Sequence, residues 1–163
     1  MPRVNSALQS VRGMPDVLPD QFAQFGVIRD AFVETTDLFG FSDVETPLVE
    51  PAELFTRSLG DASDVVGKEM YVFDERGAGA GAQQLALRPE GTAGVVRALV
   101  QSGSDRRLPV RWRYSGAFFR YERPQRARAR QFRQVGVEMF AAKSSPQVRV
   151  RALGCCCSCC VLH

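Results

Sequence analysis

The sequence predicts an α+β fold in which helices flank an antiparallel sheet, and two observations carry this prediction. Apolar side chains recur at three- and four-residue steps between residues 20 and 40, which is typical of an amphipathic helix. Between residues 110 and 140, apolar and polar side chains instead alternate in two segments joined by a short connection. Neighbouring strands joined in this way favour antiparallel pairing, and we expect the helices to pack on one face of the sheet.

The elements of the N-terminal third follow from periodicity and from stop signals. A helix is expected from Asp20, as its N-cap, to Gly40, because glycine readily adopts the positive φ of a helix end. Residues 41–45 are expected to form a short strand that Pro47 halts, and residues 51–59 a short second helix. The apolar stripe of the first helix consists of Phe22, Phe25, Ile28, Phe32 and Leu38.

The middle of the chain predicts a hairpin and a third helix. Residues 71–73 and 84–87 read as strands, and the segment 74–81 between them, rich in glycine and alanine, suits a surface turn. The third helix is expected to begin at residues 91–92 and to end at Gly103. Its start brings a carboxylate, a hydroxyl and free backbone N–H groups together, so this junction is a candidate ligand site.

Two long strands are expected at residues 110–122 and 131–140. In the second, a period of two separates an apolar side, expected to face the core, from a polar side, expected to face a ligand. The apolar side is Val135, Val137 and Met139, and the polar side is Gln134, Gly136 and Glu138. Gly136 allows close approach, and Arg120 and Glu122 share one face of the first strand. The alternative, common for antiparallel sheets, is that both polar faces meet water.

Positive charge is concentrated around the connection between these strands. Ten arginines and a single acid, Glu122, lie between residues 106 and 133, which leaves this segment at +9 and the remainder at −6, because the whole chain is +3. Proteins that coat nucleic acid spread basic residues over a face, so a small, highly charged ligand is favoured. A hairpin that contacts RNA phosphates is the alternative, although its aromatic residues do not interleave with the arginines as base-stacking platforms would.

The composition also argues against several kinds of chemistry. The single histidine is His163, the last residue, so a mechanism that depends on a histidine base or a histidine metal ligand is disfavoured. The five cysteines all lie in residues 155–160 and lack the spaced second pair of zinc and iron–sulfur sites, so no metal site is expected. The sequence has no glycine-rich phosphate loop, secretory leader or apolar run of membrane-span length, and we expect a cytoplasmic protein.

Several separated motifs occur in an order that resembles the histidyl-tRNA synthetase family of class II aminoacyl-tRNA synthetases. They are Val-Arg-Gly-Met at 11–14, Glu-Thr-Pro at 45–47, Leu-Arg-Pro-Glu-Gly-Thr at 87–92, Arg-Tyr-Glu-Arg-Pro-Gln at 120–125 and Gln-Phe-Arg-Gln-Val-Gly-Val-Glu at 131–138. The resemblance covers about residues 9–140. It implies that residues 1–140 form part of a class II catalytic core with motifs 1 and 2, followed by a divergent cysteine-rich tail, disordered or artefactual, at 141–163.

The resemblance implies that ATP, with Mg²⁺, activates L-histidine to histidyl-adenylate, and that histidine then passes to tRNA(His). Arg120 would be the catalytic residue, bridging the histidine carboxylate and the α-phosphate. The implied histidine-binding residues are Glu90, Gly91, Thr92, Arg120, Gln134 and Glu138. The implied ATP-binding residues are Arg120, Glu122, Arg128 and Phe132, with the Phe132 ring on adenine. A homodimer through motif 1 is also implied, with no prosthetic group and no protein-bound metal.

One relative of the family offers a rival interpretation, the histidine-sensing regulatory subunit of ATP phosphoribosyltransferase, which resembles the same core. The intact Arg120, Glu122 and Arg128 favour the synthetase. The sequence departs from the family at Ala127 and Ala129, beside the loop arginine, and after residue 140. Since motif 3, the second histidine-binding segment and the anticodon-binding domain are missing, we expect a fragment that does not aminoacylate alone.

Overall fold

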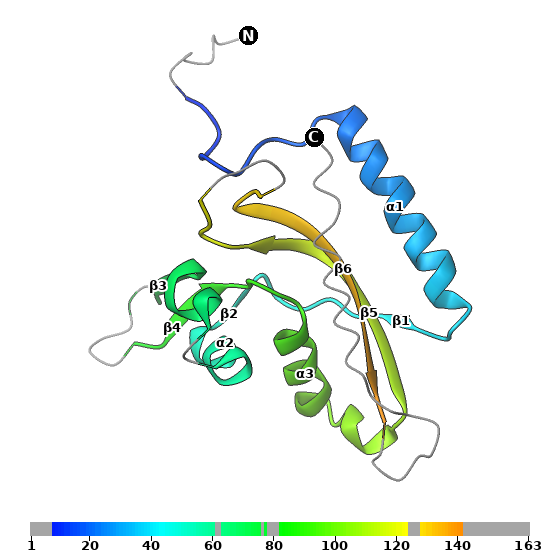
Figure 1. The fold of residues 1–163 in the computed structure, drawn as a ribbon. Coiled ribbons are helices and arrows are strands. Elements are labelled where there is room, and N and C mark those ends of the chain that lie inside the picture. The colour runs from blue at the N-terminus through cyan, green and yellow to red at the C-terminus, as the bar shows by residue number, and fades with distance from the viewer. Residues whose placement is uncertain (1–7, 61–62, 76, 78–81, 124–127, 142–163) are drawn as a thin grey trace.

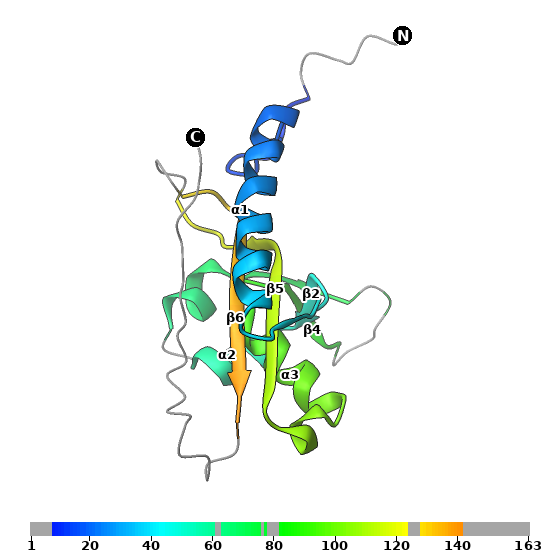
Figure 2. The ribbon, with the colours of Figure 1, turned by 90° about the vertical axis from the view of Figure 1, so that its right-hand side faces the viewer.

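Two three-stranded sheets form the framework of the chain (Figures 1 and 2). The computed structural model describes residues 8–60, 63–75, 77, 82–123 and 128–141. The strand orders are β1–β5–β6 and β2–β4–β3. The strands are β1 (Ser42–Asp43), β2 (Val49–Pro51), β3 (Tyr71–Asp74), β4 (Gln84–Leu87), β5 (Val110–Phe119) and β6 (Gln131–Phe140). The predicted α+β class is confirmed, but the predicted strands are divided between two sheets.

The long ribbon of β5 and β6 is the largest element of the fold. Its two strands pair antiparallel in unbroken register over ten residues each, as the sequence predicted. β1 joins the other edge of β5 in parallel, so the first sheet is mixed. Because strand side chains alternate, Tyr114 of β5 shares a face with Gly136 of β6, and Arg113 shares the opposite face with Val137.

Helices cover both faces of this ribbon, which corrects the expectation of one covered face (Figure 1). The helices are α1 (Pro19–Asp37), α2 (Ala52–Leu59) and α3 (Thr92–Gln101), with a π-helical turn Val65–Glu69 and a 3-10 turn Ser104–Arg107. α3 packs on the Tyr114 face, where Val95, Tyr114 and Phe118 form a buried cluster. α1 lies on the Arg113 face, to which it is hydrogen-bonded. Both faces of β5 carry side chains that pack, so alternation alone did not identify a single covered face.

The second sheet is antiparallel throughout and is covered by α2. β4 lies in its centre, paired with β2 on one side and with β3 on the other. The predicted hairpin of β3 and β4 and the predicted second helix are therefore confirmed. Their buried cluster consists of Ala52, Phe55 and Ala86, together with Ala93 of α3.

The N-terminal boundaries differ from the expected ones. α1 begins at Pro19 with Leu18 as its N-cap, and Asp20 lies in the first turn instead of capping the helix. Proline suits the first helical position because its φ is already helical and its missing N–H would have had no partner there. The strand expected at residues 41–45 is shortened to β1, and β2 was not predicted.

The end of β5 also differs from the prediction, which extended the strand to residue 122. The strand stops at Phe119, and the N–H of Tyr121 donates to the carbonyl of Glu69 at 2.6 Å instead of continuing the ladder. Arg120 and Glu122 therefore lie in irregular chain after the strand, where strand alternation no longer determines the direction of a side chain.

Arg88 joins the two sheets. It follows β4, and its carbonyl accepts the N–H of Phe119 at 3.0 Å. Its buried guanidinium donates to the carbonyls of Thr46, at 2.7 Å, and Ala117, at 3.0 Å, and lies 4.4 Å from the ring centroid of Phe118. Burial lowers the pKa of Arg88.

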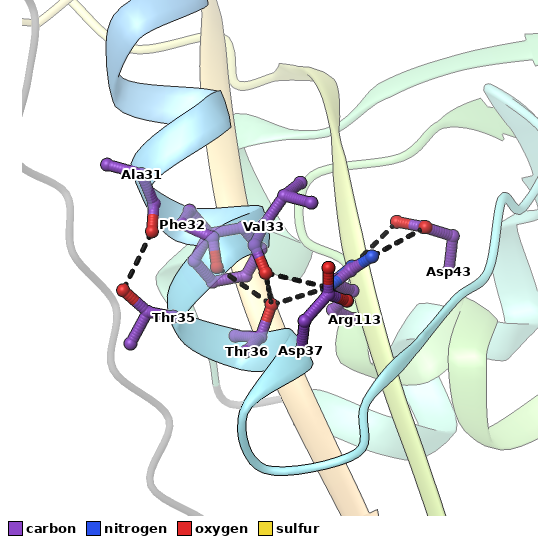
Figure 3. Close-up of polar contacts among 8 residues, drawn as sticks. All are labelled: Ala31, Phe32, Val33, Thr35, Thr36, Asp37, Asp43 and Arg113. Atoms are coloured by element: carbon purple, nitrogen blue, oxygen red, sulfur yellow. Dashed lines mark hydrogen bonds and ion pairs between the residues drawn. The ribbon is translucent and has the colours of Figure 1, made fainter.

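Arg113 attaches α1 to the ribbon, as Figure 3 shows. Its guanidinium, on a side chain that is only 6% exposed, donates to the carboxylates of Asp37 at 2.6 Å and Asp43 at 2.8 and 2.9 Å. It also donates to the carbonyl of Val33 and to the hydroxyl of Thr36. These hydrogen bonds raise the pKa of Arg113 and lower that of Asp43. The contact matters because Thr36 is the one buried residue of α1, so this cluster is where the helix is most closely packed on the ribbon.

In the part of the chain that the structure describes, no helix combines the length and the apolar character that a bilayer crossing requires.

Candidate functional site

The N-terminus of α3 forms one end of the candidate site. The carboxylate of Glu90 accepts hydrogen bonds from the backbone N–H groups of Thr92, at 2.6 Å, and Ala93, at 2.9 Å. It thereby satisfies two of the N–H groups that a helix start leaves without partners, at the positive end of the helix dipole. Glu90 is held by the helix that it caps, and its oxygens keep lone pairs for further donors.

Thr92 connects this helix start to β6. Its hydroxyl donates to the carboxylate of Glu138 at 2.7 Å, which joins residues that are 46 positions apart in the sequence. Burial raises the pKa of Glu138, the hydrogen bond from Thr92 opposes this effect, and the charge of Glu90 adds to it. Two carboxylates that repel one another favour a cationic or N–H-donating ligand, because such a ligand relieves their repulsion.

Tyr114 fills the space between the two glycines of the site. A Cβ atom on Gly91 or on Gly136 would overlap the Tyr114 ring. The sequence predicted that Gly136 leaves room for a ligand, but an aromatic side chain from the neighbouring strand occupies that space. Both glycines allow Tyr114, 8% exposed, to form part of the buried floor between α3 and β6.

Gln134 lies two residues before Gly136, on the same face of the ribbon. It is 8% exposed, and among the described residues its Oε1 finds no hydrogen-bond partner. It pairs with Gly116 in the β5 register, and a Cβ on Gly116 would overlap the guanidinium of Arg88. A buried amide oxygen without a partner is costly, so Gln134 has an acceptor to offer to a ligand.

Arg120 and Phe132 form the next part of this face. The Nε–H of Arg120 donates to the carbonyl of Pro89 at 3.0 Å, and its guanidinium carbon lies 5.3 Å from the ring centroid of Phe132. The Phe132 ring in turn lies 6.2 Å from that of Phe118 in the buried cluster. A guanidinium is thus fixed beside the residue that precedes Glu90, over an aromatic platform.

Glu122 and Arg128, both assigned to ATP by the resemblance, pair with each other beyond the end of β5. The guanidinium of Arg128 donates to the carboxylate of Glu122 at 3.2 Å. The Glu122 side chain is 17% exposed and that of Arg128 is 64% exposed. Arg128 therefore extends into solvent, where a charged ligand can reach it.

Arg130 is a residue whose individual role was not predicted from the sequence. Its Nε–H donates to the carbonyl of Glu122 at 3.1 Å, and its guanidinium carbon lies 4.0 Å from the ring centroid of Tyr121. In sequence it was one of ten arginines in a run, and nothing in the spacing distinguished it from the others.

The opposite face of the ribbon carries a cavity of about 190 Å³ between α1 and the strands. Val135, expected in the core, lines this cavity, and the whole side of β6 formed by Val135, Val137 and Met139 is half-buried. The buried cluster of Val95, Tyr114 and Phe118 lies instead on the side of Gln134 and Glu138. The polar side of β6, which the sequence predicted to face a ligand, is therefore also the side that packs against the buried cluster.

Among the described residues, no group of three or more histidine, cysteine, aspartate or glutamate side chains could hold a metal ion. The cysteines and the single histidine lie outside the described residues, as do Pro124 to Ala127 of the arginine-rich connection.

Comparison with known proteins agrees with the motifs. A family described as Histidyl-tRNA synthetase matches residues 13–152. The histidine–tRNA ligase of Nocardia farcinica is 48% identical over 134 residues, which are 82% of this chain and 31% of that protein. The histidine–tRNA ligase of Corynebacterium efficiens is 50% identical over 128 residues, 78% of this chain and 29% of that protein. The chain thus spans about a third of the length of these curated relatives.

Solved structures show the same fold. Apo histidyl-tRNA synthetase of S. aureus matches with a TM-score of 0.65 and 30% identity, over 83% of this chain and 30% of that one. A Bacillus halodurans C protein, named as an ATP phosphoribosyltransferase regulatory subunit/histidyl-tRNA synthetase, matches with a TM-score of 0.66 and 26% identity, over 83% and 33% of the two chains. The expected class II core architecture is confirmed. The family match covers most of the residues of this chain, and the chain therefore belongs to the histidyl-tRNA synthetase family.

Proposed function

We propose that this chain is the part of a histidine–tRNA ligase that holds L-histidine and ATP while histidyl-adenylate forms. One observation carries the proposal: Glu90 and Thr92 at the start of α3, Glu138 and Gln134 of β6, and Arg120 after β5 belong to one face of the β5–β6 ribbon and its covering helix. These groups are complementary to an amino acid whose carboxylate meets a phosphate.

The histidine end is built from hydrogen-bond acceptors. The amino group and imidazole of histidine carry N–H donors, and the site offers the carboxylates of Glu90 and Glu138 and the Oε1 of Gln134, which has no partner within the described part of the chain. Acceptors that are buried discriminate strongly, because an apolar analogue of histidine would leave them without partners. Gly91 contributes by admitting the Tyr114 ring that forms the floor.

The ATP end is built from guanidinium groups and one ring. Arg120 would contact both the histidine carboxylate and the α-phosphate, with adenine on the Phe132 ring and its amino group near Glu122. Arg128 would reach the outer phosphates. Histidine's carboxylate oxygen attacks the α-phosphorus and pyrophosphate leaves, a step that needs positioning and charge neutralisation more than a proton acceptor. Mg²⁺ enters with ATP as part of the substrate.

In the complete ligase, histidine would then pass to the 3′ end of tRNA(His) in the cytoplasm. The complete protein would be a homodimer through the motif 1 segment at residues 45–47. Leu48 and Val49, which follow that segment, are 46% and 39% exposed, and apolar side chains exposed next to one another favour burial by a partner.

The test is histidine-dependent ATP–pyrophosphate exchange in a chimera that joins this chain to the remaining two thirds of the Nocardia farcinica ligase. We expect exchange in the chimera and none in the 163-residue chain alone. Arg120→Ala in the chimera should lower the exchange rate by about a hundredfold or more, the usual loss for one transition-state contact. Arg111→Ala, on an exposed strand position, is the matched control and should leave the rate within twofold.

The rival function is histidine sensing without catalysis, and it is retained because the name of the similar Bacillus halodurans protein gives both a regulatory subunit and a synthetase. The same chimera distinguishes the two. Histidine binding without pyrophosphate exchange, and without an effect of Arg120→Ala, would support the sensor over the ligase.

A further inference from the structure

A turn near the N-terminus is bound to the base of the connection between β5 and β6. The N–H of Met14 donates to the carbonyl of Val11 at 2.8 Å, which closes the turn, and Gly13 within it has a φ of +82°. The carbonyl of Gly13 accepts the N–H of Arg130 at 2.7 Å and that of Gln131 at 3.3 Å. One carbonyl oxygen thus holds the residue before β6 and the first residue of the strand.

Arg130 also contacts the residues on the β5 side of the connection. Its carbonyl accepts the N–H of Arg120 at 2.9 Å, its guanidinium stacks on Tyr121, and its Nε–H donates to the carbonyl of Glu122 at 3.1 Å. Tyr121 also contacts Tyr71 of β3, with the two rings edge to face and their centroids 5.4 Å apart. Three consecutive residues after β5 are therefore held by one arginine.

The turn and the Arg130 side chain pack so closely that there is no room for a side chain at position 13. A Cβ on Gly13 would lie 2.9 Å from Cγ, 3.1 Å from Cδ and 3.3 Å from Cβ of Arg130. These distances are shorter than ordinary van der Waals contacts, and the positive φ is one that L side chains adopt rarely. Glycine is therefore required at position 13 by two separate features.

We propose that Gly13 and Arg130 form a clasp that positions Glu122 and Arg128 for the nucleotide, which makes Arg130 a positioning residue and not a phosphate ligand. The inference rests on the proposed function, since Glu122 and Arg128 meet ATP only there. Arg130 fixes the main chain of Glu122, and Arg128 pairs with its carboxylate. The histidine end does not depend on the clasp, because α3 and the β6 ladder hold its acceptors and the carbonyl of Pro89 holds the side chain of Arg120.

The first readout is amide hydrogen exchange of the 163-residue chain without any ligand. Gly13→Ala and Arg130→Lys should each speed exchange at the amides of Arg120 and Arg130 by about tenfold, the factor that corresponds to one or two lost hydrogen bonds. Arg130→Lys keeps the charge and adds no atom to the tight contact, so it tests the clasp even if Gly13→Ala does not fold.

Two matched controls separate the clasp from general effects. Gly60→Ala introduces the same strain, because Gly60 also has a φ of +82°, but none of the described residues lies within 4 Å of its Cβ position. Arg111→Lys makes the same substitution at an exposed strand position. Neither control should change exchange at Arg120 or Arg130, and equal effects of controls and test variants would overturn the clasp.

The second readout is the ratio of two affinities, measured by calorimetric titration with ATP and with L-histidine. The clasp variants should raise the Kd for ATP about tenfold and leave that for L-histidine within twofold, whereas a merely structural role would change both or neither. Faster exchange with an unchanged Kd for ATP would refute the positioning role. If the unsubstituted chain binds no ATP, the proposed function fails, while the exchange data still decide whether the clasp exists.

Discussion

The close packing of Tyr114 between two glycines makes Gly136→Ala the sharpest test of the site's floor. The new methyl group would overlap the ring and hydroxyl of Tyr114, which is 8% exposed and held by Val95 and Phe118, so it cannot move aside. Overpacking of this kind costs about 1–3 kcal/mol. For a domain of this size we expect the Tm to fall by about 3–10 °C, measured by circular dichroism.

A second glycine supplies the contrast. Gly26 lies inside α1, and no atom of the part of the chain that the structure describes lies within 4 Å of its Cβ position, so Gly26→Ala should stabilise the chain by about 0.5–1 kcal/mol through helix propensity. In addition, Gly136→Ala combined with Tyr114→Leu should be less destabilised than the sum of the two single variants. A neutral or stabilising Gly136→Ala, or strict additivity in the double variant, would refute the proposed packing.

Four further predictions concern charge and assembly. Burial raises the pKa of Glu138 in the folded chain above its ordinary value of 4.5. The free energy of unfolding should therefore fall as the pH rises from 4.5 through the raised pKa of the folded state, because the folded chain binds the proton more tightly than the unfolded chain. Glu138→Gln should flatten this dependence in urea titrations. Arg97→Leu leaves the 4% exposed carboxylate of Glu50 without its 2.6 Å ion-pair partner and should cost about 2 kcal/mol or more in the same assay. Arg29→Leu, which removes an exposed pair, should cost less than about 1 kcal/mol. Leu48→Asp should shift the Nocardia chimera toward monomer in sedimentation velocity, and an unchanged dimer would contradict the proposed interface.

Local signals in the sequence predicted the elements whose ends depend on single residues. Gly103, with a φ of +67°, follows α3 as expected, and Gly60 follows α2 with a φ of +82°. The two ladder strands of the ribbon were predicted because alternation persisted over ten residues of β6. Such features depend on short-range sterics and hydrogen bonding, which a sequence shows directly.

Features that depend on contacts between distant segments were missed. β1 has only two residues, too few for a periodic signal, and its parallel pairing to β5 brings together residues that are 70 positions apart. Arg113 and Arg130 were counted only toward the local positive charge, but the side chain of each contacts main-chain and side-chain groups of other segments. The contact between Gly136 and Tyr114 was also not predicted, because it follows from the register of β5 and β6, which the sequence does not show.

The sequence placed the residues of the candidate site in two groups, and it did not predict the contact between the groups. The sequence grouped Glu90 and Thr92 at a helix start and Gln134 with Glu138 on one side of a strand, and the hydrogen bond between Thr92 and Glu138 joins these two groups. The capping of α3 by Glu90 was not predicted, because a carboxylate at that position suits a ligand and a helix N-terminus equally well.

Binding of a non-hydrolysable histidyl-adenylate analogue, a histidyl-sulfamoyl adenosine, tests the central claim most directly. Its binding to the ¹⁵N-labelled chain can be followed residue by residue by NMR. The proposed site predicts that the largest shifts occur at the amides of Thr92 and Glu138 and that Arg120→Ala weakens binding. Shifts centred on Phe22 and Val135, which line the cavity on the opposite face, or no binding at all, would contradict it.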